Sequence, residues 1–196
     1  MKLILLTVLL LLPAFAAGQA ASDAKDTRTK HTDPVHLFSL DYSDKWTKME
    51  TDDPSESISL VHLSEAGSVE ALFIVIVQYD AELKDLTPED FANLILDDPE
   101  KIKSDARETN ETANAIEFGK TQLAGRPAYR VKFRLTENTE GVTREFTRYE
   151  NSVLVDGRVY MLMFQVETAA DGKWTAEREA IVSSFAVSGA KPESDK

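Results

Sequence analysis

The chain has 196 residues, no cysteine and a formal net charge of −12. The absence of cysteine excludes disulfides, thiolate nucleophiles, Cys-ligated zinc and a lipid-modified cysteine after a signal sequence. The acidic charge opposes binding to nucleic acid or anionic lipid through bulk charge, and the length suits one domain.

Residues 1–20 have the features of a secretory signal peptide. Lys2 supplies the positive end, an apolar run follows, and residues 14–16 or 18–20 suit a cleavage site. An uncleaved membrane anchor is the competing interpretation, but the apolar stretch at 3–17 is shorter than the roughly 20 residues needed to cross a bilayer. We therefore expect an exported protein, periplasmic or extracellular, without stable membrane insertion after cleavage.

Two polar segments flank the predicted domain. Residues 21–34 have no apolar periodicity and are predicted to be a flexible leader, with a partner-binding arm as the alternative. Residues 189–196 are predicted to be a disordered tail. The domain itself is expected to span residues 35–188.

The first part of this domain is predicted to be rich in strands and to end in a helix. Alternating or β-branched patterns predict strands at 35–42, 46–49, 58–62 and 69–79. Thr87 suits a helix N-cap and Pro88 the first helical position. Phe91, Leu94 and Ile95 form an apolar stripe at helical spacing. A second short helix is predicted from Asp98 to about residue 106.

The second part is predicted to be an antiparallel meander closed by a helix. A strand at 115–123 leads through a turn at 125–127 into three further strands within 129–165. Asp156-Gly157 is a strong signal for a two-residue hairpin turn between the last two. The final helix has Trp174, Ile181, Val182 and Phe185 on one face. These elements predict an α+β domain on a mostly antiparallel sheet with a helical insertion and a C-terminal helix.

Several segments resemble the PsbP-like superfamily, which includes PsbP, the Ran-GTP-release factor and the DcrB-like proteins. They are FSLDYSDKW at 38–46, TPEDFANLI at 87–95, LAGRPAYRVKF at 123–133, RYENSVLVDGRVYMLMF at 148–164 and IVSSF at 181–185. Two features depart from the pattern: Ser43-Asp44-Lys45 stands where members usually carry a proline before Trp46, and the lipobox cysteine of a DcrB-like lipoprotein is missing. The resemblance implies an α/β/α sandwich, no shared catalytic constellation, no cofactor and a role as a binding module.

The common catalytic and metal-binding patterns are missing from the sequence. His31, His36 and His62 have no paired-ligand spacing, and a site that joins His36 and His62 to a carboxylate would need chance convergence. No Gly-x-Ser-x-Gly segment and no glycine-rich phosphate loop occur. Asp52-Asp53 and Asp97-Asp98 are candidates only for loose calcium binding, since no EF-hand loop accompanies them.

The one distinctive charge feature is basic. Arg130, Lys132 and Arg134 line one face of a predicted strand, Arg144 and Arg148 come from the neighbouring strand, and Arg158 comes from the one after it. On an acidic chain this pattern suggests a docking surface for an acidic partner. The alternative is cross-strand pairing with acidic residues such as Glu145, Glu150 and Glu167.

These observations lead to one main functional hypothesis and two alternatives. The main hypothesis is an exported, non-enzymatic binding or accessory protein that contacts another protein. The first alternative is a carrier of a small apolar ligand in a cavity between sheet and helix, lined by Phe91, Trp174 and Met161. The second is an enzyme whose catalytic groups converge only in the folded chain.

Overall fold

The computed structural model describes residues 27–50, 56–65, 67–98, 100, 102–104, 112–139 and 142–188. The predicted signal peptide, the predicted tail at 189–196 and Asp52-Asp53 lie outside these ranges. None of the helices in the described ranges is both long and apolar enough to cross a membrane.

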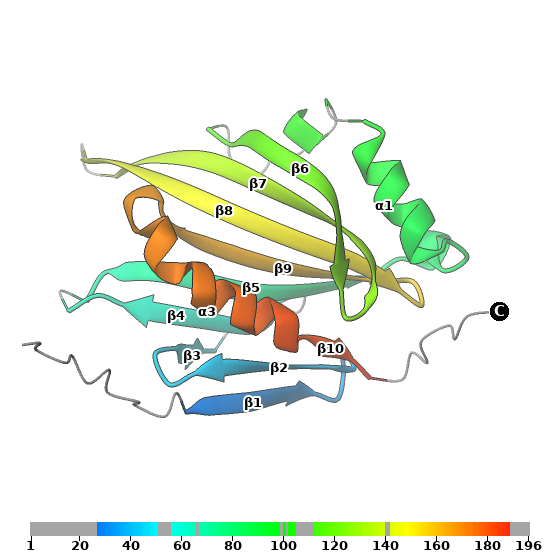
Figure 1. Cartoon of the computed structure of the whole chain (residues 1–196), viewed down its shortest axis with the longest axis horizontal. Helices are drawn as coiled ribbons and strands as arrows, with labels where there is room; N and C mark the ends of the chain where they lie inside the picture. Colours follow the sequence, from blue (N-terminus) through cyan, green and yellow to red (C-terminus); the bar gives the residue numbers. More distant parts are fainter. Residues whose placement is uncertain are drawn as a thin grey trace, which may run out of the picture.

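A seven-stranded antiparallel sheet forms the centre of the molecule (Figure 1). Its spatial order is β3-β4-β5-β9-β8-β7-β6. The strands are β3 (Thr47–Met49), β4 (Glu56–Leu63), β5 (Val69–Tyr79), β6 (Asn114–Leu123), β7 (Arg126–Thr139), β8 (Val142–Val155) and β9 (Arg158–Glu167). The predicted meander is therefore present as β7, β8 and β9, each paired with the next.

Two tight turns join neighbouring strands of the sheet. One lies between β8 and β9, and the other lies between β6 and β7. Asp156 and Gly157 have φ values of 51° and 74°, as the Asp-Gly signal predicts for a turn that needs positive φ at both positions. Ala124 and Gly125, with φ values of 52° and 71°, form the turn between β6 and β7. This turn lies earlier than the predicted 125–127, because residues 126 and 127 already belong to β7.

A small three-stranded sheet contains β1 (Arg28–Asp33), β2 (Phe38–Ser43) and β10 (Ala186–Val187), with β2 in the middle. β1 corrects, for residues 28–33, the prediction that residues 21–34 form a flexible leader; residues 21–26 lie outside the described ranges. Residues 28–33 have no apolar pattern, but they pair with β2 along their whole length. The Arg28 guanidinium also donates to the Asp41 carbonyl oxygen at 2.8 Å. Backbone pairing therefore orders a segment that its side chains do not identify as a strand.

Helices lie on both faces of the large sheet. They are α1 (Pro88–Leu96) and α3 (Asp171–Ser184), with short 3-10 helices at Ala81–Leu83 and Thr168–Ala170. Thr87 caps α1 by accepting a hydrogen bond from the Asp90 amide, as predicted. The predicted apolar stripe is only partly right, because Leu94 is 58% exposed while Phe91 is buried. The predicted second helix lies only partly within the described residues.

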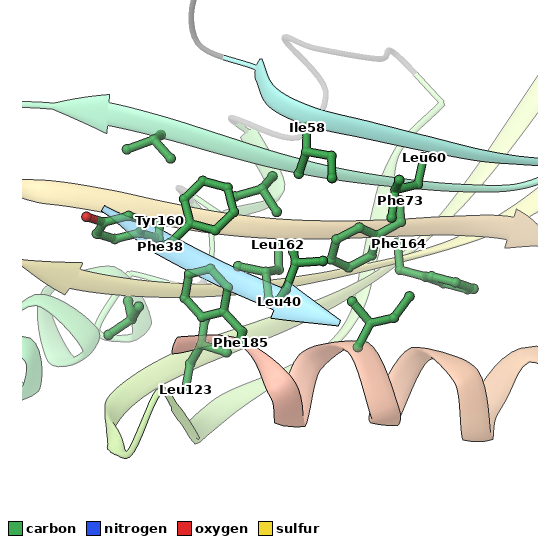
Figure 2. Packing of buried hydrophobic residues seen from close by; sticks show 14 of the residues in the cluster. Phe38, Leu40, Ile58, Leu60, Phe73, Leu123, Tyr160, Leu162, Phe164 and Phe185 are labelled. Carbon is green, nitrogen blue, oxygen red and sulfur yellow. The ribbon is translucent and has the colours of Figure 1, made fainter. Parts of the chain in front are cut away.

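The core is divided between the two faces of the sheet. On one face, α3 and β2 cover apolar side chains of β4, β5 and β9 (Figure 2). Phe164 lies there with Trp46 and Trp174, at ring-centroid distances of 6.1 and 6.5 Å. On the other face, α1 covers apolar side chains of β6, β7 and β8, including Phe133 and Leu135. The fold is thus α+β with mostly antiparallel strands and helices on both sides.

Candidate functional site

Alternation along β7 gives its two faces opposite character. Val131, Phe133 and Leu135 are buried on the α1 side. Arg130, Lys132 and Arg134 therefore point to the α3 side, since successive side chains in a strand alternate. The sequence prediction of a basic stripe on one face of this strand agrees with the structure.

The predicted basic set is divided between the two faces of the sheet. The register pairs Lys132 with Tyr149, and it pairs Arg148 with Phe133. Because side chains of paired residues share a face, Arg148 lies on the α1 side, and Arg144, four residues earlier on β8, lies there too. The prediction that all five residues belong to one surface is therefore wrong for Arg144 and Arg148.

A groove of about 920 Å³ lies between α3 and the polar side of β6, β7 and β8. We call it the basic groove, because its lining contains four cationic side chains: Arg126, Arg130, Lys132 and Arg178. The acidic residues of the lining are Glu117, Glu150 and Glu179, and the side chain of Glu150 faces α1 because this residue lies opposite Val131. The end of the groove near β10 is apolar, with Val182, Phe185 and Val187. Arg134 lies on the same strand face but outside the lining.

A tyrosine and an aspartate fix two of the groove's cations. The Tyr149 hydroxyl donates to Asp171 Oδ2 at 2.6 Å, and Arg178 Nη1 lies 3.2 Å from Asp171 Oδ1. Both cations approach the Tyr149 ring, with the Arg178 guanidinium at 3.7 Å and Lys132 Nζ at 4.9 Å from its centroid. Lys132 Nζ is also 3.7 Å from Asp171 Oδ2. This network holds both cations in place.

Electrostatic surroundings keep Lys132 charged. The pKa of its ammonium is raised above the ordinary value, first by its interaction with Tyr149 and then, against the opposing effect of burial, by the charge of Asp171. Lys132 therefore carries a full positive charge at neutral pH.

Arg130 is the more accessible cation in this part of the groove. Its side chain is 56% exposed and its Nη2 lies 3.0 Å from Glu117 Oε1. An exposed ion pair of this kind contributes about 0–1 kcal/mol, so Arg130 can exchange Glu117 for another carboxylate at low cost.

Each predicted basic residue has an acidic or polar neighbour, as the alternative of cross-strand pairing predicts. Arg134 lies 3.9 Å from Glu145. On the other face Arg144 pairs with Glu167, and Arg148 donates to Gln165 Oε1 at 2.8 and 3.0 Å. The interactions of Arg144 and Arg148 are therefore structural. In the basic groove, Arg130 and Lys132 also have acidic neighbours, but the surface around them is open and cationic.

Sequence reasoning did not identify Arg126, Tyr149 and Arg178 as part of a site. Arg178 is four residues after Trp174 and three before Ile181, which places it beside the buried face of the helix. That spacing was an available signal. Tyr149 lies opposite Lys132 on the neighbouring strand. This position can be recognised only when the pairing register of the two strands is known.

One cluster elsewhere has the residue types of a hydrolase triad. Asp33 Oδ2 lies 2.9 Å from His36 Nδ1, and Ser57 Oγ lies 3.0 Å from the same nitrogen. A triad needs the carboxylate on one ring nitrogen and the nucleophile on the other. The arrangement therefore does not activate Ser57. Burial opposes ionisation of Asp33, but hydrogen bonds from His36 and Val35 outweigh it and lower the pKa of this carboxyl.

The remaining predicted sites find no support in the described ranges. No group of three or more His or acidic side chains in them is arranged to hold a metal ion. The cavity predicted between Phe91, Trp174 and Met161 does not exist as such, because Trp174 and Phe91 are buried in cores on opposite faces of the sheet. Met161 instead lines a pocket of about 320 Å³ on the α1 side.

Comparison with known structures supports the fold. The cyanobacterial PsbP (CyanoP) of Synechocystis sp. PCC 6803 has a TM-score of 0.58 at 14% identity, over 87% of this chain and 98% of that one. The Ran-binding protein Mog1p of Saccharomyces cerevisiae has a TM-score of 0.51 at 10% identity, over 83% of this chain and 96% of that one. Comparison with curated proteins gives no match.

The family model described as PsbP matches residues 27–187. This range begins at β1 and ends at β10, so it includes every described strand and both helices. The chain therefore belongs to the PsbP family.

Proposed function

We propose that this protein is an exported, non-enzymatic binding or accessory protein that contacts another protein through the basic groove. The observation that carries the proposal is the gathering of Arg126, Arg130, Lys132 and Arg178 in one groove of a chain whose net charge is −12. Such a local reversal of charge favours a partner segment rich in Asp or Glu.

The construction of the groove also suits binding. Lys132 and Arg178 are already held by Tyr149 and Asp171, so a partner that meets them does not have to immobilise two long side chains. Each such immobilisation costs about 0.5–1.5 kcal/mol at an interface. The apolar end at Val182 and Val187 offers a place for an aliphatic side chain of the same partner.

The structural neighbours agree with a binding role. One of them is named a Ran-binding protein, and this chain shares its fold. The signal-like segment at residues 1–20 supports export, which places the partner outside the cytoplasm.

The arrangement of titratable groups beside the groove favours binding over catalysis. Lys132, Tyr149, Asp171 and Arg178 converge, as the enzyme alternative requires. Asp171, however, accepts hydrogen bonds from Tyr149 and Arg178 and lies near the Lys132 ammonium, so its carboxylate is engaged by two donors and a neighbouring cation and is a poor general base.

Arg130→Glu tests the groove, and Lys120→Glu is a matched control. Both side chains are slightly more than half exposed, and both make an exposed ion pair with a glutamate, at 3.0 and 2.8 Å. Lys120, however, pairs with Glu89 of α1 on the other side of the sheet. In affinity purification from the producing cell, Arg130→Glu is expected to lose a specific partner that wild type and Lys120→Glu retain. Recovery of the same partners by all three proteins would overturn the proposal.

A second candidate function is the carriage of a small apolar ligand. The pocket of about 320 Å³ between the sheet and α1 favours it, since ligand sites begin at about 300 Å³. The test is calorimetric titration of the purified protein with 2-phenylethanol, a compact and mostly apolar probe. Saturable binding is expected, and heats no larger than those of dilution would reject this candidate.

A further inference from the structure

The pocket on the α1 side of the sheet contains a carboxyl group in mostly apolar surroundings. Its lining includes Ile76, Val131, Phe133, Met161 and Met163 from three strands, with Ile95 and Ile102 closing it from the helical side. Glu150 of β8 lies among them, opposite Val131 on one neighbouring strand and Met163 on the other. Its side chain is only 17% exposed.

The charge of Glu150 is incompletely compensated. Within the described ranges its cationic neighbour is Arg148, whose Nη1 lies 3.8 Å from Glu150 Oε1, beyond hydrogen-bond distance. Arg148 directs its Nε and Nη2 to Gln165 instead. A buried carboxylate is costly unless it is both paired and hydrogen-bonded, so this group retains capacity for a charged donor.

The protonation behaviour of Glu150 agrees with this geometry. Burial raises the pKa of its carboxyl above the ordinary value, and the nearby Arg148 only partly opposes the shift. A well-compensated carboxylate would show the opposite direction.

From the pocket and its carboxyl group we infer that this site binds a small organic amine, with the ammonium on Glu150 and the apolar body between Met161, Met163 and Phe133. The ammonium supplies the charge-assisted hydrogen bond that Arg148 does not make. The inference rests on the second candidate function and sharpens it by naming the chemical class of the ligand. The basic groove lies on the other side of the sheet, and Val131 and Glu150 are the residues that line both sites.

Methionine methyl groups provide a direct readout of this pocket. The chain has four methionines, of which Met161 and Met163 line the pocket and Met49 lies on β3, away from it. We would label the purified protein with methyl-13C methionine and titrate it at pH 8 with 2-phenylethylamine. Its neutral analogue 2-phenylethanol has nearly the same shape and serves as the comparison ligand.

The expected result is a saturable shift of the Met161 and Met163 signals by the amine, with no shift of Met49. Glu150→Gln should weaken amine binding by at least about tenfold, which corresponds to 1.4 kcal/mol, and leave binding of the alcohol nearly unchanged. Glu145→Gln is the matched control, because Glu145 lies on the same strand, points to the opposite face and is 59% exposed. It should bind the amine as wild type does.

Two results would overturn the inference and are distinguishable. Equal binding of amine and alcohol, unaffected by Glu150→Gln, would leave the carrier function standing and remove the amine assignment. Unmoved Met161 and Met163 signals with both probes at about 10 mM would reject the carrier function as well. The Met49 signal and the circular dichroism spectrum verify that each variant is folded.

Discussion

The two halves of the large sheet differ on the face that carries α3. In the β4-β5-β9 half, this face presents Leu60, Phe73 and Phe164, all covered by the helix and the small sheet. In the β6-β7-β8 half, the same face buries Leu123, Ala128 and Val153 and also presents Arg130, Lys132 and Tyr149, where it is open as the basic groove. One face of one sheet is thus covered by packed elements in one half and carries an open, cationic groove in the other.

The apolar core lies on both faces of the large sheet, and β9 contributes to both parts of it. β9 is apolar on both faces, with Leu162 and Phe164 toward α3 and Met161 and Met163 toward α1. β7 carries its large buried side chains, Val131, Phe133 and Leu135, toward α1, and only the small Ala128 belongs to the core on the α3 side. The half that bears the groove is therefore stabilised mainly by the core on the α1 side.

Phe164→Ala should destabilise the protein most, by about 3–5 kcal/mol, because it removes a fully buried ring that packs against Trp46 and Trp174. Asn151→Ala, on the same sheet face in the groove half, should change stability by less than about 0.5 kcal/mol. Urea unfolding measures both. Comparable losses in the two variants would show that the two halves do not differ as described.

Glu177→Ala should cost about 1–3 kcal/mol. Its carboxylate accepts from Trp46 Nε1 at 3.1 Å and from the Ser43 amide at 3.3 Å, and both donors would be left buried without it. Glu179→Ala, two residues later on the groove side of α3, should be nearly neutral. Urea midpoints that place the two variants in the reverse order would contradict the assignment of the helix faces.

Tyr149→Phe should cost about 1 kcal/mol, since it removes one hydrogen bond to Asp171 and keeps the ring between its cationic neighbours. It should also loosen Lys132 and Arg178, which is measurable as faster side-chain motion in NMR relaxation. Unchanged side-chain motion in this variant would mean that Tyr149 does not position the cations.

Glu150→Gln should give the smallest change in stability, and that change is a gain. The folded-state pKa of Glu150 is raised, so wild type binds its proton more tightly when folded and loses stability as the pH rises from the unfolded pKa through the folded one. The variant lacks this loss. In thermal unfolding, the variant should be more stable than wild type at pH 8 and equally stable near pH 3. A gain in stability that is independent of pH would refute this prediction.

Much of the fold was predictable because local signals agreed with tertiary structure. The Asp156-Gly157 turn, the Thr87 cap and the alternation in β7 each depend on a few adjacent residues. β1 was missed because its order comes from backbone pairing with β2, which leaves no apolar pattern in residues 28–33. A polar strand of this kind can be recognised only when the strand with which it pairs is known.

The site was predictable only within one strand. Alternation correctly placed Arg130, Lys132 and Arg134 together, but the relative facing of two strands depends on their register. A shift by one residue would have moved Arg144 and Arg148 to the groove, and the actual register sets Arg148 opposite Phe133. The contribution of Arg178 required knowledge of how α3 lies over the sheet.

Site-specific photo-crosslinking in the producing cell tests the central claim most directly. A photo-reactive residue in place of Ser183, an exposed residue of α3 that lines the groove, should capture a specific partner protein. The same residue in place of Leu94, exposed on α1 on the other side of the sheet, should not, and Arg130→Glu should abolish the adduct at Ser183. An adduct that forms only from Leu94, or one from Ser183 that survives Arg130→Glu unchanged, would contradict partner binding through the basic groove.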